Sequence, residues 1–452
     1  MAKRTGRNTQ RSNAQRSSAP RRNASAGRAD ARKRAEYKKK QRQKWIIRII
    51  TLLIVVALIV TLVLSVGSCN RDRGNEPAGS SSTEEQTTPE QGSGDEETPA
   101  AQTGRVTLTA VGDIIAHDTI LELAKTGDSY DFSSLFSILK PDISRMDLAI
   151  ANVETPLGGG PYIGYPAFNT PDEMGEAVID AGFDVALQAS NHSMDSGADG
   201  IHHGIDFWKK HTDEILMVGL HESQEEADEI PITTVNGIKF AVLNYTYGLN
   251  DYELPGDEQY LVTLMNDGTK DYISNQVKEA DEKADFVIAC PHWGDEGQVG
   301  APNGFQEDWA ELFTEAGADL IIGTHPHVIE NIEWINADNG NKALCYYSLG
   351  NFVSNQQYTD LVLGAMAYVE IEKDADGNAV IVEDSAKAVP VVTHNDKTQT
   401  PTVIQTYYLA DYTEELASVH DTLLTYDENF SLALLQQKAE DVLGKWMIDR
   451  LP

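Results

Sequence analysis

Cysteine is scarce in this sequence. The 452 residues include three cysteines, Cys69, Cys290 and Cys345, and no two of them have the close spacing of a metal-binding pair. The sequence therefore argues against a structural zinc site rich in thiolates. Cys290 and Cys345 lie in apolar runs, where we expect two small buried side chains, and the sequence alone leaves a disulfide between them open.

Positive charge is scarce outside the first 48 residues. That leader holds 17 of the 36 Lys and Arg and 2 of the 70 Asp and Glu, so the rest carries 36 − 17 = 19 basic and 70 − 2 = 68 acidic residues, a net charge of −49. This excess argues against nucleic acid as a partner. It suits a solvated extracellular surface or a site that recruits cations.

Large apolar side chains are nearly absent from two N-terminal segments, which flank one long apolar run. Residues 1–44 cannot bury enough surface to fold, and they predict a basic, disordered cytoplasmic tail. Residues 45–66 contain the uncharged run from Ile49 to Val66 and predict one transmembrane helix with its basic flank inside the cell. Residues 67–104, rich in Gly, Ser, Thr, Pro and Glu, predict a flexible linker. A single-pass cell-membrane protein with an extracellular C-terminal domain is the expected arrangement.

Two other interpretations of the apolar run stay open. A cleaved secretory signal is one, although its apolar region is usually shorter. The other is lipidation at Cys69, because small residues run into this cysteine as they do before the acylated cysteine of a bacterial lipoprotein. Both interpretations also place the rest of the chain outside the cytoplasm.

Six short apolar runs between residues 105 and 395 read as strands, and helix-like stretches separate them. This alternation predicts an α/β layered domain over residues 105–395. In such sheets ligands collect beyond the carboxyl ends of the strands, so the run endings are expected to share one pocket. The helix-like stretches are 132–146 (broken near Pro141), 171–182, 200–211, 269–284 and 305–318. The runs end at Asp113, at Asn152 and Glu154, at Asn191 and His192, at His292, at His325 and His327, and at Asn351.

The C-terminal part changes character. Residues 366–392 alternate apolar and polar side chains around Asp376 and Gly377, which predicts a hairpin and hence a mixed or antiparallel part of the sheet. Residues 396–452 predict a helical extension without assigned chemistry.

The polar endings suit one divalent metal site. Imidazole, carboxylate and amide ligands fit Mn, Zn or Fe. His325 and His327 can point the same way if the segment stays extended past Gly323, while Pro326 restricts the backbone between them. An isolated pair of this kind is weak support, and the polar groups at the other strand ends strengthen it.

Seven motifs in order, "AVGDIIAHD", "ANVETPL", "SNHSMDSGADGI", "NYTYGLN", "PHWGDE", "GTHPHV" and "YSLGNF", make residues 106–355 resemble the bacterial CapA, or poly-γ-glutamate capsule biosynthesis, family. That family resembles the calcineurin-like metallophosphoesterases. The resemblance implies a sandwich of two mixed β-sheets flanked by helices, with one or two divalent ions at the loops after the strands.

The resemblance also implies roles for residues. His192 becomes the candidate acid, and Asp195 either orients it or caps the helix that begins near Gly197. Asn152, Tyr245, Tyr247 and Asn351 become candidate substrate contacts, Asn351 alternatively holding a turn. The implied metal ligands are Asp113, Glu154, Asn191, His292, His325 and His327.

The implied function is that of a metal-dependent hydrolase or transferase in capsule or poly-γ-glutamate biosynthesis or export. The alternative is a non-catalytic subunit that binds the polymer. Either would work with an anionic envelope polymer and with polymer synthase or export subunits.

Two departures from the metallophosphoesterase pattern favour one metal over two. The usual Asp-x-His is replaced by Asp113 followed by Ile114 and Ile115, with His117 as a candidate substitute. The bridging Asp of the second motif is replaced by the Asn152-Val153-Glu154 triplet. Outside the pattern, we expect His202 and His203 to be structural or solvated, and His211, His221, His394 and His420 to lie on the surface.

Overall fold

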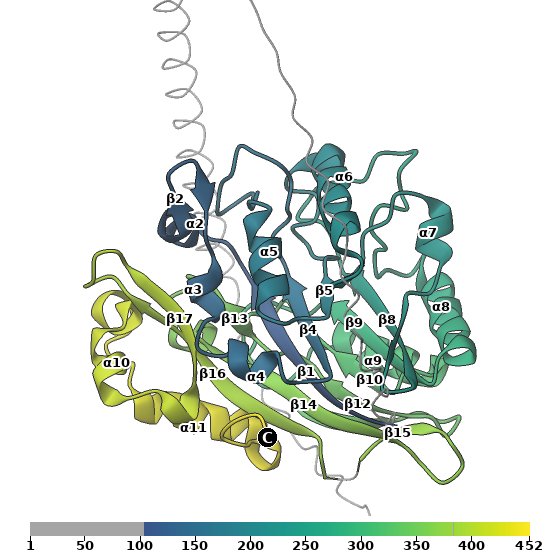
Figure 1. Ribbon diagram of the computed structural model, residues 1–452. Coiled ribbons are helices and arrows are strands. Elements are labelled where there is room, and N and C mark those ends of the chain that lie inside the picture. The colour runs from purple at the N-terminus through teal and green to yellow at the C-terminus, as the bar shows by residue number, and fades with distance from the viewer. Residues whose placement is uncertain (1–103, 383) are drawn as a thin grey trace, which may run out of the picture. The chain divides into compact units, whose positions relative to one another are not determined.

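The computed structural model describes residues 104–382 and 384–452 (Figure 1). The predicted tail, transmembrane helix and Cys69 lie outside the described residues, as does the predicted linker except for Gly104. Among the residues described, no helix combines the length and the apolar character needed to cross a bilayer. Cys290 and Cys345 are both buried and free, so no disulfide joins them.

Two large mixed sheets form the domain. In the nine-stranded sheet, strands β1, β4, β5 and β6 pair in parallel. Strands β14, β16 and β17 pair antiparallel with their neighbours. Its order is β17 (Val403–Tyr408), β16 (Lys387–Asp396), β14 (Leu363–Lys373), β1 (Arg105–Ile114), β4 (Leu148–Val153), β5 (Val185–Leu187) and β6 (Leu216–Val218), with β13 (Asn351–Val353) beside β1 and β15 (Ala379–Ile381) beside β14.

The six-stranded sheet has four parallel central strands and antiparallel edges. Its order is β11 (Ile332–Asn336), β12 (Lys342–Tyr346), β10 (Leu320–Ile322), β9 (Phe286–His292), β8 (Ile238–Thr246) and β7 (Ile232–Val235). A separate two-stranded ribbon pairs β2 (Lys125–Thr126) with β3 (Ser129–Tyr130).

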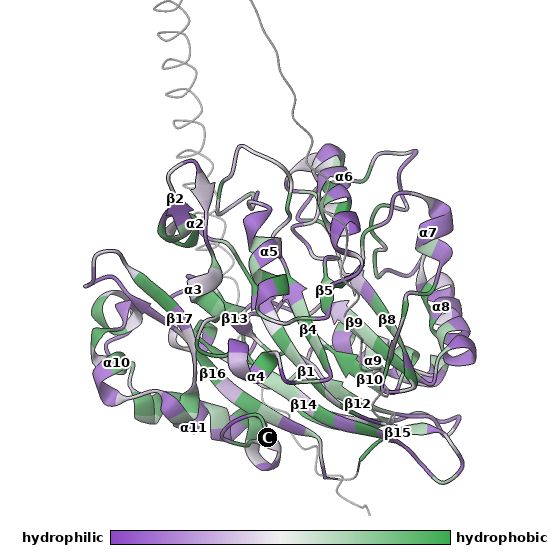
Figure 2. Cartoon of the chain, viewed as in Figure 1, coloured by the Kyte–Doolittle hydropathy of each residue, from purple (hydrophilic) through white to green (hydrophobic). Residues whose placement is uncertain are grey.

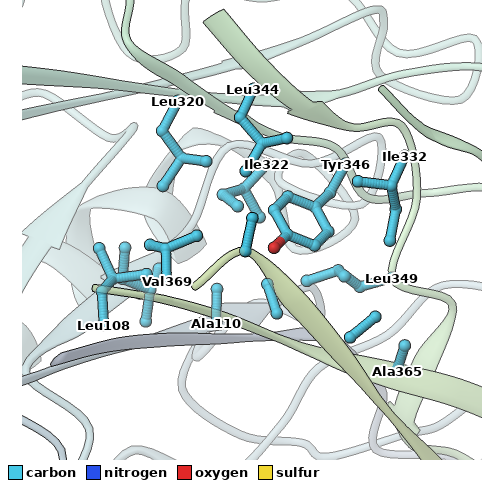
Figure 3. Close-up of a cluster of buried hydrophobic side chains, with 14 of the residues drawn as sticks. Leu108, Ala110, Leu320, Ile322, Ile332, Leu344, Tyr346, Leu349, Ala365 and Val369 are labelled. Carbon is cyan, nitrogen blue, oxygen red and sulfur yellow. The ribbon is translucent and has the colours of Figure 1, made fainter. Parts of the chain in front are cut away.

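The two sheets pack face to face over a shared apolar core. Figure 3 shows Leu320 and Leu344 of the small sheet on one side of this core and Leu108 and Val369 of the large sheet on the other. Side chains alternate between the two faces of each strand. In β4, for example, Leu148 and Ile150 enter the shared core, and Ala149 and Ala151 face the helices.

Helices cover the outer face of each sheet. Those over the large sheet are α2 (Asp118–Ala124), α3 (Ser133–Phe136), α4 (Lys140–Ile143), α5 (Glu173–Asp180) and α6 (Gly197–Trp208); those over the small sheet are α8 (Lys270–Lys283) and α9 (Gly304–Ala316). Figure 2 shows hydrophilic colour over much of α8. The break near Pro141 separates α3 from α4 as predicted, and a capping box of Asn303 and Gln306 starts α9.

The remaining helical segments are short or C-terminal. They are α7 (Gln224–Asp228), α10 (Glu414–Val419), α11 (Leu432–Leu443), the 3-10 turns Lys209–His211, Thr359–Leu361, Leu409–Asp411 and Gly444–Trp446, and the π turn Thr422–Tyr426.

One repeated device sets where the parallel strands begin. An aspartate precedes β4, β5, β9 and β10, and in each case its Oδ2 accepts the backbone N–H of a residue near the start of the neighbouring strand. The four pairs are Asp147 with Thr107 (2.8 Å), Asp184 with Ala149 (2.7 Å), Asp285 with Lys239 (2.9 Å) and Asp319 with Val287 (2.8 Å). This device fixes the register of neighbouring parallel strands at their amino ends.

All six predicted runs are strands, and the predicted hairpin at Asp376 and Gly377 joins β14 to β15. The extension predicted to be helical over residues 396–452 contains α10 and α11, and it also contains a strand. Residues 403–408 form β17, because alternation buries Ile404, Thr406 and Tyr408 against the large sheet. Helix α11 then adds Leu435, among others, to the shared core.

Candidate metal centre

The predicted strand endings meet in one buried place. Asp113 is the last residue but one of β1, Glu154 follows β4, His292 ends β9, and the two histidines of "THPH" follow β10. Their exposed fractions show the degree of burial: 0% for Asp113, Asn191 and His292, 1% for Glu154, 2% for His325 and 4% for His327. These strand endings therefore converge in one buried cluster, as the sequence predicts.

Glu154 is at the middle of this group. Neither of its carboxylate oxygens has a hydrogen-bond partner among the described residues. Its Oε1 lies 3.8 Å from Nε2 of His192, 4.0 Å from Nε2 of His292 and 3.8 Å from Nε2 of His327. Ligand atoms about 2.0–2.2 Å from one ion lie roughly 3–4 Å from each other. The spacing is too long for hydrogen bonds and fits atoms that surround a cation.

Burial raises the pKa of Glu154 well above its usual range. A buried carboxylate without donors is costly, so a cation would offset the cost. Two overlapping ligand groups, each with its atoms within 4.8 Å of one another, contain this residue: Glu154 with His325 and His327, and Glu154 with Asp113 and His292.

Asp113 is fixed by three neighbours. Its Oδ1 accepts hydrogen bonds from Nδ2 of Asn152 at 2.8 Å and from the backbone N–H of His325 at 3.3 Å. Its Oδ2 lies 2.9 Å from Nδ1 of His327. Burial opposes a charge on His327, yet the nearby Glu154 and Asp113 carboxylates raise the pKa of His327 to about 9.

His292 and Asn191 face each other across the site. His292 Nδ1 lies 3.0 Å from Oγ1 of Thr324, and its Nε2 lies 2.9 Å from Oδ1 of Asn191. Burial, then the neighbouring His325, lowers the pKa of His292 well below its usual range. A neutral imidazole is the form that ligates metals. Thr324 holds Nδ1, and Nε2 faces Asn191, another predicted ligand.

The loop with His325 and His327 does not stay extended, which was the condition considered for the two side chains to point the same way. Their φ angles are 98° and 60°, both in the left-handed region. The side chains nevertheless converge, with ring centroids 5.8 Å apart. Gly323 is needed because a Cβ there would collide with the carbonyl oxygen of Tyr347 and the indole nitrogen of Trp293.

His192 is held from behind. Its Nδ1 lies 2.6 Å from Oδ2 of Asp195, which also accepts the Phe168 N–H at 2.7 Å. The Phe168 ring packs edge-on against the imidazole at 4.8 Å. In the described chain, the N-cap of α6 is Ser196 and has no side-chain cap, so of the two roles considered for Asp195 the geometry shows the orienting one.

Comparison with known proteins places the chain in a family. Residues 107–356, more than half of the chain, match the family model described as bacterial capsule synthesis protein PGA_cap. The chain belongs to this family.

Two relatives are similar in sequence to this PGA_cap member. The "PGA biosynthesis protein CapA" of Bacillus subtilis (strain 168) is 27% identical over 355 residues, which cover 75% of this chain and 87% of the relative. The "Capsule biosynthesis protein CapA" of Bacillus anthracis is 30% identical over 265 residues, which cover 56% of this chain and 61% of the relative. The match thus spans less than two thirds of the Bacillus anthracis protein.

The solved structures are less similar to this chain than the two Bacillus relatives are. The calcineurin-like phosphoesterase YfkN from Bacillus subtilis is 15% identical with a TM-score of 0.36, covering 75% of this chain and 98% of that one. A putative 5'-nucleotidase from Staphylococcus aureus is 14% identical with a TM-score of 0.37, covering 63% and 54%. At such scores nothing about the site is taken from them.

The residues after Asp113 show the first departure from the expected Asp-x-His pattern. Ile114 and Ile115 are buried among apolar side chains, at 0% and 2% exposure. The backbone N–H of Asn355 donates to Nδ1 of His117 at 3.1 Å. Burial, with His327 and His192 nearby, lowers the pKa of His117 to about 4, so this residue lies beside the site.

The two tyrosines among the candidate substrate contacts lie in different places. Tyr245 points away from the site: its ring stacks on Phe313 at 5.9 Å, because side chains alternate along β8 and this one faces α9. A substrate contact at Tyr245 is therefore wrong. The Tyr247 ring lies 4.5 Å from that of His325.

The two asparagines support the backbone and Asp113. Asn351 donates to the Leu361 carbonyl and to Gln356, both at 2.8 Å, and so holds a turn. Asn152 holds Asp113, as described above.

Two residues that the sequence patterns missed help to build the site. Asn250 accepts from Nδ2 of Asn191 at 3.1 Å and places its own Nδ2 3.3 Å from Nδ1 of His192. It lines a surface cavity of about 420 Å³ together with Tyr247. Thr324 orients His292. The signal for Asn250 is the apolar run 238–246, a seventh strand whose end faces the same pocket.

Histidines outside the pattern have structural contacts. His202 lies 3.0 Å from Glu258 and His203 lies 2.9 Å from Asp172, both partly exposed. The surface expectation is wrong for His394 and His420, which are 1% and 0% exposed. The C-terminal segment covers them: His394 contacts the Tyr412 hydroxyl at 2.8 Å, and His420 contacts the Thr393 carbonyl at 3.1 Å. His211 and His221 are partly buried.

Proposed function

We propose that this PGA_cap member is a membrane-anchored, extracytoplasmic, metal-dependent hydrolase or transferase that acts on an anionic cell-envelope polymer. One observation carries the proposal: the donor-free carboxylate of Glu154 lies 3.8–4.0 Å from three imidazole Nε2 atoms. The printed names of the two Bacillus relatives support capsule or poly-γ-glutamate biosynthesis as the setting.

The donor set fits a divalent ion of the Mn, Zn or Fe kind. Its oxygen donors come from Asp113, Glu154 and Asn191, and its nitrogen donors from His292, His325 and His327. When bound, such an ion supplies an acidified water and positive charge for a developing oxyanion. The buried Nδ1 of His325 has no hydrogen-bond partner in the described chain. It is therefore free to bind a cation.

The chain itself supplies proton transfer and orientation. Asp195 fixes Nδ1 of His192, which leaves Nε2 directed toward Glu154. In this position His192 can hold a proton at Nε2 and donate it to a leaving oxygen. Phe168 restricts the ring from one side and Asn250 contacts it from another.

A non-catalytic polymer-binding subunit is the second candidate. It is favoured by Ile114 and Ile115, which stand where a first histidine ligand is usual, and by Asn152 in place of an acid. These replacements reduce the site to one secure ion. A subunit of this kind would hold polymer for synthase or export partners.

The deciding experiment uses the full chain, purified in detergent and supplied in turn with Mn, Zn and Fe. We expect about one tightly bound ion per chain, lost in His292→Ala and His325→Ala and kept in His203→Ala, whose side chain pairs with Asp172 outside the site. Absence of a stoichiometric ion under every condition would overturn both the hydrolase and the metal site.

Turnover separates the two candidates. Phosphoesters and γ-glutamyl polymers are offered to the loaded protein, and hydrolysis or transfer abolished by His292→Ala supports the enzyme. Metal binding with polymer binding but without turnover favours the subunit. Lipid labelling that disappears in Cys69→Ala would replace the transmembrane anchor by lipidation.

A further inference from the structure

A second cavity lies away from the metal centre and shares no residue with it. Its volume is about 590 Å³, within the ~300–1,000 Å³ usual for ligand pockets. β15 and the loop after it lie at the end of the sheets opposite α6 (Figure 1). The lining residues are Trp334, Lys342, Ile381, Val382, Asp384, Ala386, Lys387, Lys445 and Trp446; we call it the lysine–tryptophan cavity.

The cavity is far from the metal centre along the strands. Lys342 is the first residue of β12, whereas the strand ends at Tyr346 beside Ile322 of β10, just before the histidine loop. At about 3.3 Å per residue, these positions are roughly 13 Å apart. Lys387 likewise opens β16.

Its charge runs against that of the chain. The whole sequence has a net charge of −34, yet the lining offers three lysines and one described acid, Asp384. Most described lysines and arginines lie within 4.0 Å of a carboxylate. Lys342, Lys387 and Lys445 have no such ion pair with any described residue. Unpaired cations gathered in one cavity of an acidic protein point to an anionic occupant.

The aromatic side chains add an apolar surface beside each charge. Nζ of Lys342 lies 3.9 Å from the ring centroid of Trp334, and Nζ of Lys445 lies 4.5 Å from that of Trp446. These contacts hold the ammonium groups at the rings without neutralising them. Ile381, Val382 and Ala386 extend the apolar wall.

We propose that the lysine–tryptophan cavity binds a segment of a linear polymer whose carboxylates are separated by short methylene spacers. The ammonium groups would bind the carboxylates, and the indole and aliphatic surfaces would cover the methylenes. This inference rests on the proposed function, because the same polymer would reach the metal centre. The cavity would then bind one part of the polymer while another part is processed at the metal centre or passed on.

The test measures binding of fluorescent poly-γ-glutamate of defined length to the full chain in detergent, with a chelator present. We expect the double variant Lys342→Gln/Lys445→Gln to bind roughly tenfold or more weakly and with less dependence on salt. The matched control is Lys210→Gln/Lys278→Gln, which removes two described lysines without ion pairs from elsewhere and should bind like the wild type.

A metal-site variant keeps this test separate from the proposed function. His325→Ala should lose the ion yet bind the polymer as the wild type does under chelation. Equal binding by the lysine variant and its control would overturn the inference, as would binding that only His325→Ala abolishes. A wild-type preference for polyphosphate would overturn the carboxylate class. Polymer binding through the cavity without any turnover would leave the inference standing and refute the enzyme.

Discussion

Replacing Glu154 by glutamine should stabilise the metal-free chain, and a divalent ion should reduce or cancel that gain. The substitution keeps the shape of the side chain and removes the charge. In the metal-free chain the carboxyl group is 1% exposed, and both oxygens lack donors among the described residues. His327, whose Nε2 lies 3.8 Å away, offsets only part of the cost of burial, because the pKa of Glu154 stays well above its usual range. Glu154→Gln should therefore stabilise the metal-free fold.

The size of the effect follows from two terms. An unsatisfied buried polar group costs about 1–3 kcal/mol, which is the gain expected for the metal-free variant. An ion at 100 times its dissociation constant stabilises the wild type by about 2.7 kcal/mol. If loss of the ligand weakens affinity about 100-fold, the variant gains only about 0.4 kcal/mol. Addition of metal should therefore shrink the variant's advantage by about 2.3 kcal/mol.

Thermal unfolding of the full chain in detergent, with chelator and then with Mn, Zn or Fe, measures both terms. Glu330→Gln is a matched control, because Glu330 is 0% exposed and its Oε2 already accepts from Gln306; its stability change should not depend on metal. Equal metal-induced shifts in the wild type and Glu154→Gln would refute the ligand role. A metal-free Glu154→Gln that melts below the wild type would refute the claim that burial of the Glu154 carboxylate destabilises the metal-free fold.

Three further predictions follow from single contacts. Gly323→Ala should lower the free energy of unfolding by about 1–3 kcal/mol or more, as overpacking does, and the variant should no longer bind the ion. In the control Gly304→Ala the added Cβ meets nothing, so stability and metal binding should both be kept. Asp195→Asn should lower kcat roughly 10- to 100-fold with metal content and KM unchanged; a fall in metal content instead would make Asp195 part of the metal site. Burial raises the pKa of Asp319 to about 7, above the ~3.9 of an unfolded aspartate, so its protonated form stabilises the fold at low pH and this contribution, at most about 4 kcal/mol, is lost as pH rises toward 7. Asp319→Asn should thus flatten the dependence of unfolding free energy on pH between about 4 and 7, and an unchanged slope would contradict the shifted pKa.

The strands and their endings were predictable because each strand is a short apolar run that stops at polar residues. A strand buried on both faces reads as a continuous apolar run, and a length of about four to eight residues separates such a run from a helix. Asp113, Glu154 and His292 could be brought together on that basis, since parallel strands deliver their carboxyl ends to one edge. The proximity of these three residues could therefore be predicted from the sequence alone.

The errors arose where a side chain's direction or cover depends on distant packing. Tyr245 and Tyr247 differ by two positions, yet β8 ends at Thr246, so only the second escapes the strand's alternation and turns toward His325. His394 looks like a surface residue in its own strand. It is buried because Tyr412 and His420 arrive from the C-terminal segment, and no local pattern records that arrival.

The loop with His325 and His327 has a backbone conformation that its local sequence does not predict, and contacts with distant residues hold it in place. Left-handed φ at His325 and His327 costs on the order of 1–3 kcal/mol each and persists only if the surroundings over-determine it. Here Asp113 binds the backbone N–H of one histidine and the Nδ1 of the other, while Gly323 lets the Tyr347 carbonyl and Trp293 approach from behind. The glycine therefore acts through its missing Cβ and not through flexibility. A loop held in this way places its imidazoles before any ion binds, so the strain is borne by the folded chain and need not be met by the binding energy of the metal.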